Sequence, residues 1–246
     1  NSMKSITNLK EMKSQKYKIF PYHSTLVNKT ILNETSFKNS SKKLVVVVDA
    51  STPTPDKDSG SNGIINMMIS FKKLGNDVVF IGFDNFCYFP FYTDMLACYQ
   101  IYTYFRSCNE SKLDNTRKLY EFLEMADLIV FCKYNTIHTF NSVFTKYKHK
   151  ILFHTLDLNF LRLKREAILF GKKIDNNLEN KELYYIKNSK YSSVINDFEL
   201  EYLKNINISE NIIKIPINLM FPSEKTLYRS EDRYGIIFVA GFNHPQ

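Results

Sequence analysis

The chain has 246 residues, of which 44% are hydrophobic and 15% aromatic, so it can bury the core of one large domain or of a domain with appendages. Its 7 glycines and 7 prolines indicate that most of the chain is regular structure. No apolar run approaches the roughly 20 residues that a membrane-spanning helix needs. The polar, basic N-terminus lacks the apolar segment of a signal peptide, so we expect a cytoplasmic protein.

The net charge is +8, and much of the excess is lysine within the first 43 residues. Two interpretations of this excess remain open. The lysines either form a solvated tail or attract an anionic lipid or an anionic substrate. Arginine is scarce beside lysine and no recognition motif is present, so we expect no nucleic-acid partner.

The cysteines form no C-x-x-C pair; they are Cys87, Cys98, Cys108 and Cys132. Because no secretion signal is present, free thiols are favoured over a disulfide. Neither His138 nor His149 lies at a zinc-ligand spacing from a cysteine pair, so we expect no bound metal.

Strand and helix patterns alternate from Leu44 onward, after a polar, basic N-terminal arm at 1–42. The predicted strands are 44–49, 77–82, 101–105, 127–132, 150–154, 192–196 and 212–217. The predicted helices are 63–74, 92–99, 112–125, 136–147, 159–170, 180–188 and 197–204. This alternation predicts parallel βαβ units, and therefore a Rossmann-like, doubly wound α/β sheet with helices on both faces.

Composition divides the rest of the chain into three parts. We expect the Rossmann-like domain to occupy 43–218 and a polar linker with Pro222 to occupy 219–233. Residues 234–246 (YGIIFVAGFNHPQ) combine a buried-strand run with a glycine turn, as the start of a second Rossmann-like domain does. We therefore expect this chain to be the first half of a larger two-domain protein.

Open α/β sheets bind ligands at the carboxyl ends of their strands, where the first candidate is the loop after the first strand. Ser59, Gly60, Ser61 and Asn62 precede a predicted helix, whose free N–H groups and dipole favour a phosphate or a carboxylate. The alternative is a capped loop, with Ser61 or Asn62 as the N-cap. The spacing is not G-x-G-x-x-G, so no dinucleotide is expected.

A second candidate begins where the fifth predicted strand ends, at His154. Asp157, Arg162 and Glu166 form a dense charged group there, although Arg162 and Glu166 stand four residues apart and could simply pair on one helix face. His154 is either a general base or a buried, hydrogen-bonded histidine.

Two further positions follow strands. Glu199 lies in the first turn of a predicted helix, where N-capping by Asp197 is the structural alternative. Asn243 and His244 follow the buried-strand run at 236–239.

Together these segments resemble the N-terminal, acceptor-side half of a GT-B fold glycosyltransferase of the bacterial surface-polysaccharide (O-antigen or capsule) type. The matching pieces occur in the family's order: VVVDASTPTPDKDSGSNG, MADLIVFCK, KILFHTLDLNFLRLKREA, SSVINDFELEYL, IIKIPIN and GIIFVAGFNHPQ. The resemblance implies two Rossmann-like domains facing a cleft, with no obligatory metal and no cofactor beyond a nucleotide-sugar substrate.

The resemblance also implies roles for individual residues. Ser59, Gly60 and Ser61 match the glycine loop beneath the donor phosphates, and Asn62 stands where the family often has arginine. Asp157 and Arg162 match a segment that lines the cleft, and Glu166 and Glu199 flank it. His154 stands where the family often has aspartate, so Asp157 and His154 are the candidate catalytic pair. Asn243 and His244 match the opening turn of the donor domain.

The function implied is transfer of a sugar from a nucleotide-sugar donor to a growing surface glycan or a lipid-linked acceptor. We expect the chain to be inactive alone, and to contact the anionic inner face of the membrane peripherally. The alternative is a non-catalytic carbohydrate-binding or degenerate module within a larger assembly. A nicotinamide-dependent enzyme is disfavoured because G-x-G-x-x-G is missing.

Overall fold

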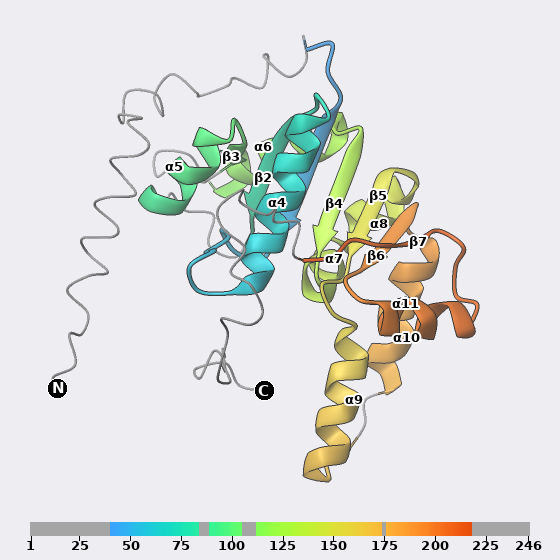
Figure 1. Cartoon of the computed structure of the whole chain (residues 1–246). Helices are drawn as coiled ribbons and strands as arrows, with labels where there is room; N and C mark the ends of the chain where they lie inside the picture. The colour runs from blue at the N-terminus through green and yellow to red at the C-terminus, as the bar shows by residue number, and fades with distance from the viewer. Residues whose placement is uncertain (1–39, 84–88, 105–111, 174–175, 218–246) are drawn as a thin grey trace, which may run out of the picture.

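A computed structural model describes residues 40–83, 89–104, 112–173 and 176–217. Within them lies a seven-stranded, all-parallel sheet with helices, which confirms the predicted Rossmann-like α/β fold (Figure 1). The strands are β1 (Leu44–Asp49), β2 (Asp77–Gly82), β3 (Tyr102–Tyr104), β4 (Leu128–Cys132), β5 (Ile151–His154), β6 (Tyr191–Val194) and β7 (Ile212–Lys214). Their order across the sheet is β3-β2-β1-β4-β5-β6-β7.

Helices connect the strands, and their labels follow Figure 1. They are α4 (Ser59–Lys73), α5 (Pro90–Cys98), α6 (Lys112–Met125), α7 (Tyr134–Thr139), α8 (Asn141–Tyr147), α9 (Asn159–Phe170), α10 (Asn176–Asn188) and α11 (Asp197–Asn205). A short 3₁₀ turn, Lys148–Lys150, precedes β5.

β1 is an interior strand, between β2 and β4, and is buried along its whole length. Val46 lies opposite Val79 of β2 on one side and opposite Ile129 of β4 on the other. Every residue of β1 from Leu44 to Val48 is apolar, as expected where helices cover both faces of a parallel sheet.

Two apolar cores lie on the two faces of the sheet. Val45 and Val47 pack with α4 and α5 on one face. Val46 and Val48 point to the other face, where α6, α7, α8, α10 and α11 contribute the core. The alternation along β1 therefore divides the helices between the two faces, as a doubly wound sheet requires.

Some element bounds differ from the sequence-based expectation. α4 begins four residues earlier than expected, at Ser59, because Asp58 caps it. The helix expected at 136–147 is two helices that meet at Phe140, whose φ of −96° and ψ of 33° interrupt the helical path. The Phe140 ring is buried and stacks on Phe131, which holds this break against the sheet.

The last strand is shorter than expected, ending at Lys214. Beyond it the chain crosses to the other face, where Ile217 lies against Gly63 of α4. Cys98 and Cys132 are free thiols, as expected. The arm predicted at 1–42 falls almost entirely outside the described residues, and the segments 219–233 and 234–246 fall wholly outside them.

One comparison of leucines tests the placement of the outer helices. Leu203 of α11 is fully buried, whereas Leu74, which ends α4, is 77% exposed. We expect Leu203→Ala to lower the free energy of unfolding by roughly 2–5 kcal/mol. Leu74→Ala should change it by no more than about 0.5 kcal/mol. Urea denaturation followed by circular dichroism measures both, and equal effects would contradict the packing of α11 on the sheet.

Candidate ligand site at the carboxyl edge of the sheet

The strand order reverses direction between β1 and β4, because successive strands run outward from β1 to β3 and then outward again from β4 to β7. The connections that leave β1 and β4 therefore go to opposite faces of the sheet. Such a switch point opens a crevice at the carboxyl ends of the two strands, which is where ligands bind in open α/β sheets. The residues that follow β1 and β4 are therefore the first candidates for a ligand site.

An ion pair joins these two strand ends. Lys133 Nζ lies 3.0 Å from Asp49 Oδ2, and the Ala50 N–H donates to Asp49 Oδ1 at 2.7 Å. The Asp49 side chain is 3% exposed and that of Lys133 is 44% exposed. Burial raises the pKa of Asp49, against the pull of Lys133. Burial lowers the pKa of Lys133, but attraction to Asp49 outweighs it and leaves that pKa raised.

The Lys133 backbone is strained. Its φ of 70° and ψ of 153° lie in a region that residues other than glycine rarely adopt, at a cost of order 1–3 kcal/mol. The Lys133 N–H donates to the His154 carbonyl at 2.9 Å and Nζ holds Asp49, so contacts at both ends of the residue maintain this conformation. Such strain concentrates at functional sites, and here it places a cation at the switch point.

The loop after β1 closes on itself before α4. Asp58 is the N-cap, and its carboxylate accepts the Ser61 N–H at 2.7 Å and the Ser61 hydroxyl at 2.6 Å. The Thr54 N–H donates to Ser61 Oγ at 2.9 Å. Ser61 and Asn62 are therefore not N-caps, and Ser59, Gly60, Ser61 and Asn62 belong to the first turn of the helix rather than to the loop before it.

The polar side chains of this turn mainly form hydrogen bonds with the loop that precedes α4. The Asn62 amide donates to the Pro55 carbonyl at 2.8 Å, so Asn62 and Ser61 both hold the loop against the helix. A Cβ on Gly60 would lie 3.2 Å from Asp58 Oδ1 and 4.0 Å from the Leu156 side chain. Gly60 thus brings α4 close to the segment that follows β5.

His154, at the end of β5, is 2% exposed and its Nδ1 lies 2.8 Å from Ser193 Oγ. Burial, together with nearby Lys133, lowers its pKa to about 4. The imidazole is therefore neutral at physiological pH, and one of its nitrogens has a partner on β6. This geometry agrees with the interpretation of His154 as a buried, hydrogen-bonded histidine.

Two glutamates hold the N-terminus of α9. Glu199 Oε1 accepts the Leu158 N–H at 2.9 Å. Glu182 accepts the N–H groups of Asn159 at 3.1 Å and Phe160 at 2.8 Å. These side chains occupy the place at a helix N-terminus where an anionic ligand binds in many proteins. Burial raises the pKa of Glu182 to about 7 and also raises that of Glu199, whose Oε2 is buried without a hydrogen-bond partner among the described atoms.

The charged residues at the start of α9 pair differently from the expected helical pair. Arg162 Nε lies 2.7 Å from Asp157 Oδ2, and Glu166 Oε1 lies 2.8 Å from Lys172 Nζ. The alternative of an Arg162–Glu166 ion pair is not observed, because each residue has a closer partner outside the helix. Asp157 and Arg162 are 45% and 56% exposed, so both face solvent at the carboxyl edge.

The structure also settles the cap of α11. Asn196, rather than Asp197, is the N-cap, and its side chain accepts the Glu199 N–H at 2.8 Å. Glu199 therefore turns back toward α9 instead of toward solvent. Asn243 and His244 lie outside the described residues.

Sequence reasoning missed two parts of this edge. Asp49 and Lys133 each follow a run of buried apolar residues, so their positions at strand ends could have suggested a shared site. No such signal marks Glu182 in the sequence, because this residue lies within a polar helix. It accepts the Asn159 N–H only because α10 packs beside α9 in the fold. In the described ranges, no group of three or more His, Cys, Asp or Glu side chains is arranged to hold a metal ion.

Comparison with known proteins found no matching family model, no matching curated protein and no matching solved structure. None of the helices in the described part of the chain combines the length and the apolar composition needed to cross a bilayer.

The Asp49–Lys133 pair can be tested by removing its cation. Lys133→Met leaves a buried carboxylate with the Ala50 N–H but without its cation, so we expect a loss of roughly 3 kcal/mol in the free energy of unfolding. The double variant Asp49→Asn/Lys133→Met should recover part of this loss. Lys146→Met, which breaks an exposed pair with Glu124, should cost at most about 1 kcal/mol. Urea denaturation at pH 7 measures all three, and a harmless Lys133→Met would contradict the pairing.

The raised pKa of Glu182 predicts a pH-dependent stability. The folded state favours the protonated form, so this contribution is complete below about pH 4.5 and is lost as the pH rises through 7. Glu182→Gln mimics the protonated form. Relative to the wild type, it should therefore gain up to roughly 3 kcal/mol of stability between pH 5 and pH 8.

The difference between the two proteins is the quantity to measure, because the lowered pKa of His154 gives the opposite slope below pH 6.5 in both of them. Glu201→Gln, an exposed glutamate on α11, is the matched control. A Glu182→Gln difference that stays constant across this pH range would contradict the assignment.

Proposed function

We propose that this chain forms the acceptor-side domain of a GT-B glycosyltransferase, which transfers a sugar from a nucleotide-sugar to a growing surface glycan or a lipid-linked acceptor. The observation that carries the proposal is the convergence of three sequence segments on one edge of the sheet. The first turn of α4, Lys133 and the segment after β5 meet there. Gly60 lies next to Leu156, and the Lys133 N–H donates to the His154 carbonyl. These segments include those on which the resemblance to the family depends.

Sugar transfer from a nucleotide-sugar requires stabilisation of the diphosphate leaving group. Lys133 supplies a partly exposed cation at this edge. Within the described residues, the N–H groups of Ser59 and Gly60 have no hydrogen-bond acceptor, and they lie at the positive end of α4. We propose that these groups face the donor phosphates. Asp58 already occupies part of this helix end, so a phosphate would bind beside it rather than on Ser61.

We assign the carboxylate that contacts the acceptor hydroxyl to Asp157. It is exposed at the edge and Arg162 holds its orientation, whereas His154 is buried and neutral. His154 instead fixes the end of β5 through Ser193. We further propose that the protein works in the cytoplasm at the inner face of the membrane, to which its net charge of +8 attracts it.

A second candidate is a non-catalytic carbohydrate-binding module. This function is favoured because the side chains of Ser61 and Asn62, which a catalyst would expose to its substrate, form hydrogen bonds with the loop that precedes α4. Such a module would bind a glycan and leave nucleotide-sugars unchanged.

Sugar transfer by the complete protein that carries this chain distinguishes the two functions. We expect Asp157→Asn to lower kcat by about 100-fold or more, as loss of a general base or acid does. Glu124→Gln, which removes an exposed ion-paired carboxylate outside the proposed site, is the control and should retain activity. The assay offers a panel of nucleotide-sugars and measures labelled sugar on a polyprenyl-linked acceptor. Full activity of Asp157→Asn would remove that residue from the mechanism, and glycan binding without any transfer would favour the binding module.

A further inference from the structure

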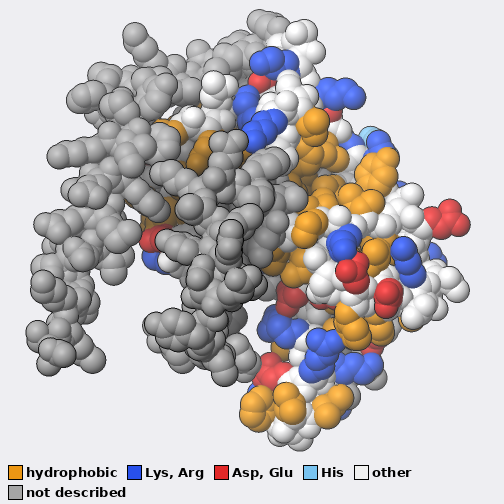
Figure 2. Space-filling view, in the orientation of Figure 1, with side chains coloured by type: hydrophobic (Ala, Val, Ile, Leu, Met, Phe, Trp, Pro, Cys, Tyr) orange, Lys and Arg blue, Asp and Glu red, His pale blue; other side chains and the backbone are white. Residues whose placement is uncertain are grey.

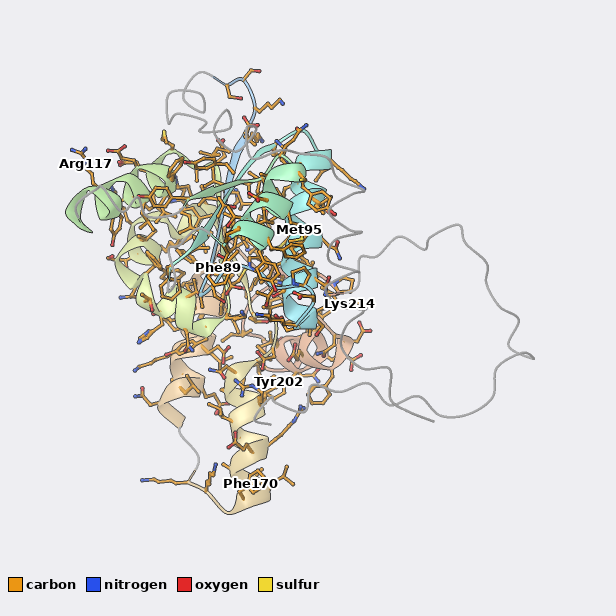
Figure 3. All side chains as sticks on the ribbon, turned by 90° about the vertical axis from the view of Figure 1, so that its left-hand side faces the viewer. Phe89, Met95, Arg117, Phe170, Tyr202 and Lys214 are labelled. Atoms are coloured by element: carbon orange, nitrogen blue, oxygen red, sulfur yellow. The ribbon has the colours of Figure 1, made fainter. Side chains whose placement is uncertain are left out.

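The exposed C-terminal tip of α9 lies away from the carboxyl edge of the sheet. α9 leaves the carboxyl edge of the sheet and extends away from it, and Figure 3 places Phe170 at the opposite end of the molecule from Arg117. In the space-filling view, apolar side chains gather at this end and basic side chains lie immediately above them (Figure 2).

The last turn of α9 is apolar and exposed. Ile168, Leu169 and Phe170 are 69%, 78% and 64% exposed, and they are consecutive in the sequence. Consecutive helical residues are about 100° apart, so these three side chains span about 200° of the helix circumference. A helix that packs its side on another protein presents a stripe with spacings of three and four residues instead. The geometry here favours end-on contact of the helix tip.

Four basic residues flank this apolar tip in the sequence and form a group that we call the basic collar; they are Lys164, Arg165, Lys172 and Lys173. Glu179 and Glu166 pair with Lys164 and Lys172 respectively. Lys173 has no ion-pair partner in the described part of the chain. The collar therefore keeps a net positive charge directly beside the exposed apolar side chains.

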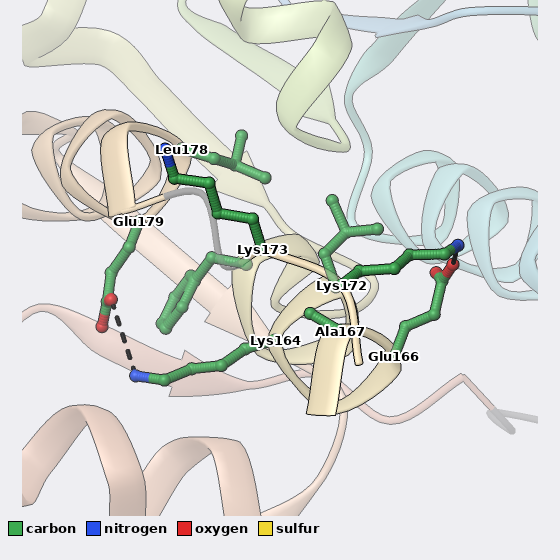
Figure 4. Close-up of a pocket in the computed structure, with 9 residues that line it drawn as sticks. Lys164, Glu166, Ala167, Lys172, Lys173, Leu178 and Glu179 are labelled. Carbon is green, nitrogen blue, oxygen red and sulfur yellow. Dashed lines mark hydrogen bonds and ion pairs between the residues drawn. The ribbon is translucent and has the colours of Figure 1, made fainter. Parts of the chain in front are cut away.

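A small pocket opens within the collar, between α9 and α10 (Figure 4). Its volume is about 270 Å³. Its lining consists of four apolar side chains, three lysines and two glutamates; they are Phe160, Leu163, Ala167, Leu178, Lys164, Lys172, Lys173, Glu166 and Glu179. Because the glutamates pair with Lys164 and Lys172, Lys173 is the lysine of this pocket that has no ion-pair partner among the described residues. A lipid phosphate in this pocket would contact Lys173, and the first carbons of its acyl chain would contact the apolar wall.

We infer that the tip of α9 and this pocket dock on an anionic phospholipid bilayer. An exposed apolar tip with cations beside it fits the interface of a membrane, where apolar side chains insert below the headgroups and lysines remain at their level. The inference adds a membrane-binding surface to the proposed function, and it places the contact on α9 rather than on residues 1–42. Binding to lipid needs no sugar donor, so the two proposals fail independently.

Vesicle co-sedimentation of the whole chain tests the apolar tip. The wild type should sediment with vesicles of phosphatidylglycerol and phosphatidylcholine, and far less with phosphatidylcholine alone. Ile168→Ser/Leu169→Ser/Phe170→Ser should lower the partition coefficient by roughly tenfold or more, because the inserted apolar area is lost. Leu74→Ser, which is 77% exposed at the end of α4, is the matched control and should bind as the wild type does.

The basic collar is tested in the same assay. Lys172→Gln/Lys173→Gln should weaken binding to the anionic vesicles by roughly tenfold, whereas Lys187→Gln/Lys204→Gln, the same charge change in the last turns of α10 and α11, should not. Circular dichroism confirms that each variant is folded. Unchanged sedimentation of both α9 variants would overturn the inference and assign any lipid binding to another surface, such as the basic arm at 1–42.

A fluorescent reporter gives a second, independent measurement, because the chain contains no tryptophan. Phe170→Trp should show a blue shift of its emission maximum when anionic vesicles are added, and Leu74→Trp should not. A blue shift without lipid, together with dimeric elution on size exclusion, would instead assign the tip to contact with a second copy of the chain and would overturn the inference.

Discussion

The pairing of Asp49 with Lys133 is the interaction on which the carboxyl edge depends. β1 is buried along its whole length, so the carboxylate at its end is held where water cannot reach it. A buried carboxylate is tolerated only with a partner, and the chain supplies Lys133 from the end of β4. The pair therefore links the two strands at which the winding of the sheet reverses. It also holds an ammonium group at the point where a ligand would enter.

The same physical requirement recurs at the helices that start from this edge. Asp58 caps α4, Asn196 caps α11, and Glu182 with Glu199 holds the first N–H groups of α9. At each of these three helix starts an oxygen from the chain itself accepts at least one of the free N–H groups, so an added anion must compete with these oxygens or bind beside them. Lys133 and Arg162 are partly exposed cations at this edge, and in the proposed function they would face the ligand.

The sheet could be predicted from the sequence because its signal is local. A run such as Leu44 to Val48 identifies a strand covered on both faces without knowledge of its neighbours. The start of α4 was placed too late because Ser61 and Asn62 are also good capping residues, and sequence alone does not show which oxygen reaches the free N–H groups. The role of Glu182 could not be predicted, because it depends on how α10 returns beside α9. Residues that act at the end of their own strand are thus easier to find than residues brought in by another helix.

α9 connects the two surfaces on which the functional proposals rest. Its N-terminus is held at the carboxyl edge by Glu182 and Glu199, and its C-terminus carries the exposed apolar tip. A helix of 12 residues rises about 18 Å, so a tip seated in the headgroup layer keeps the edge within about that distance of the bilayer surface. In the proposed function, the diphosphate of a lipid-linked acceptor would lie at that surface, and a glycan of a few sugars would span the remaining distance. The length of α9 would then set how far from the membrane the reacting end of such an acceptor meets Asp157.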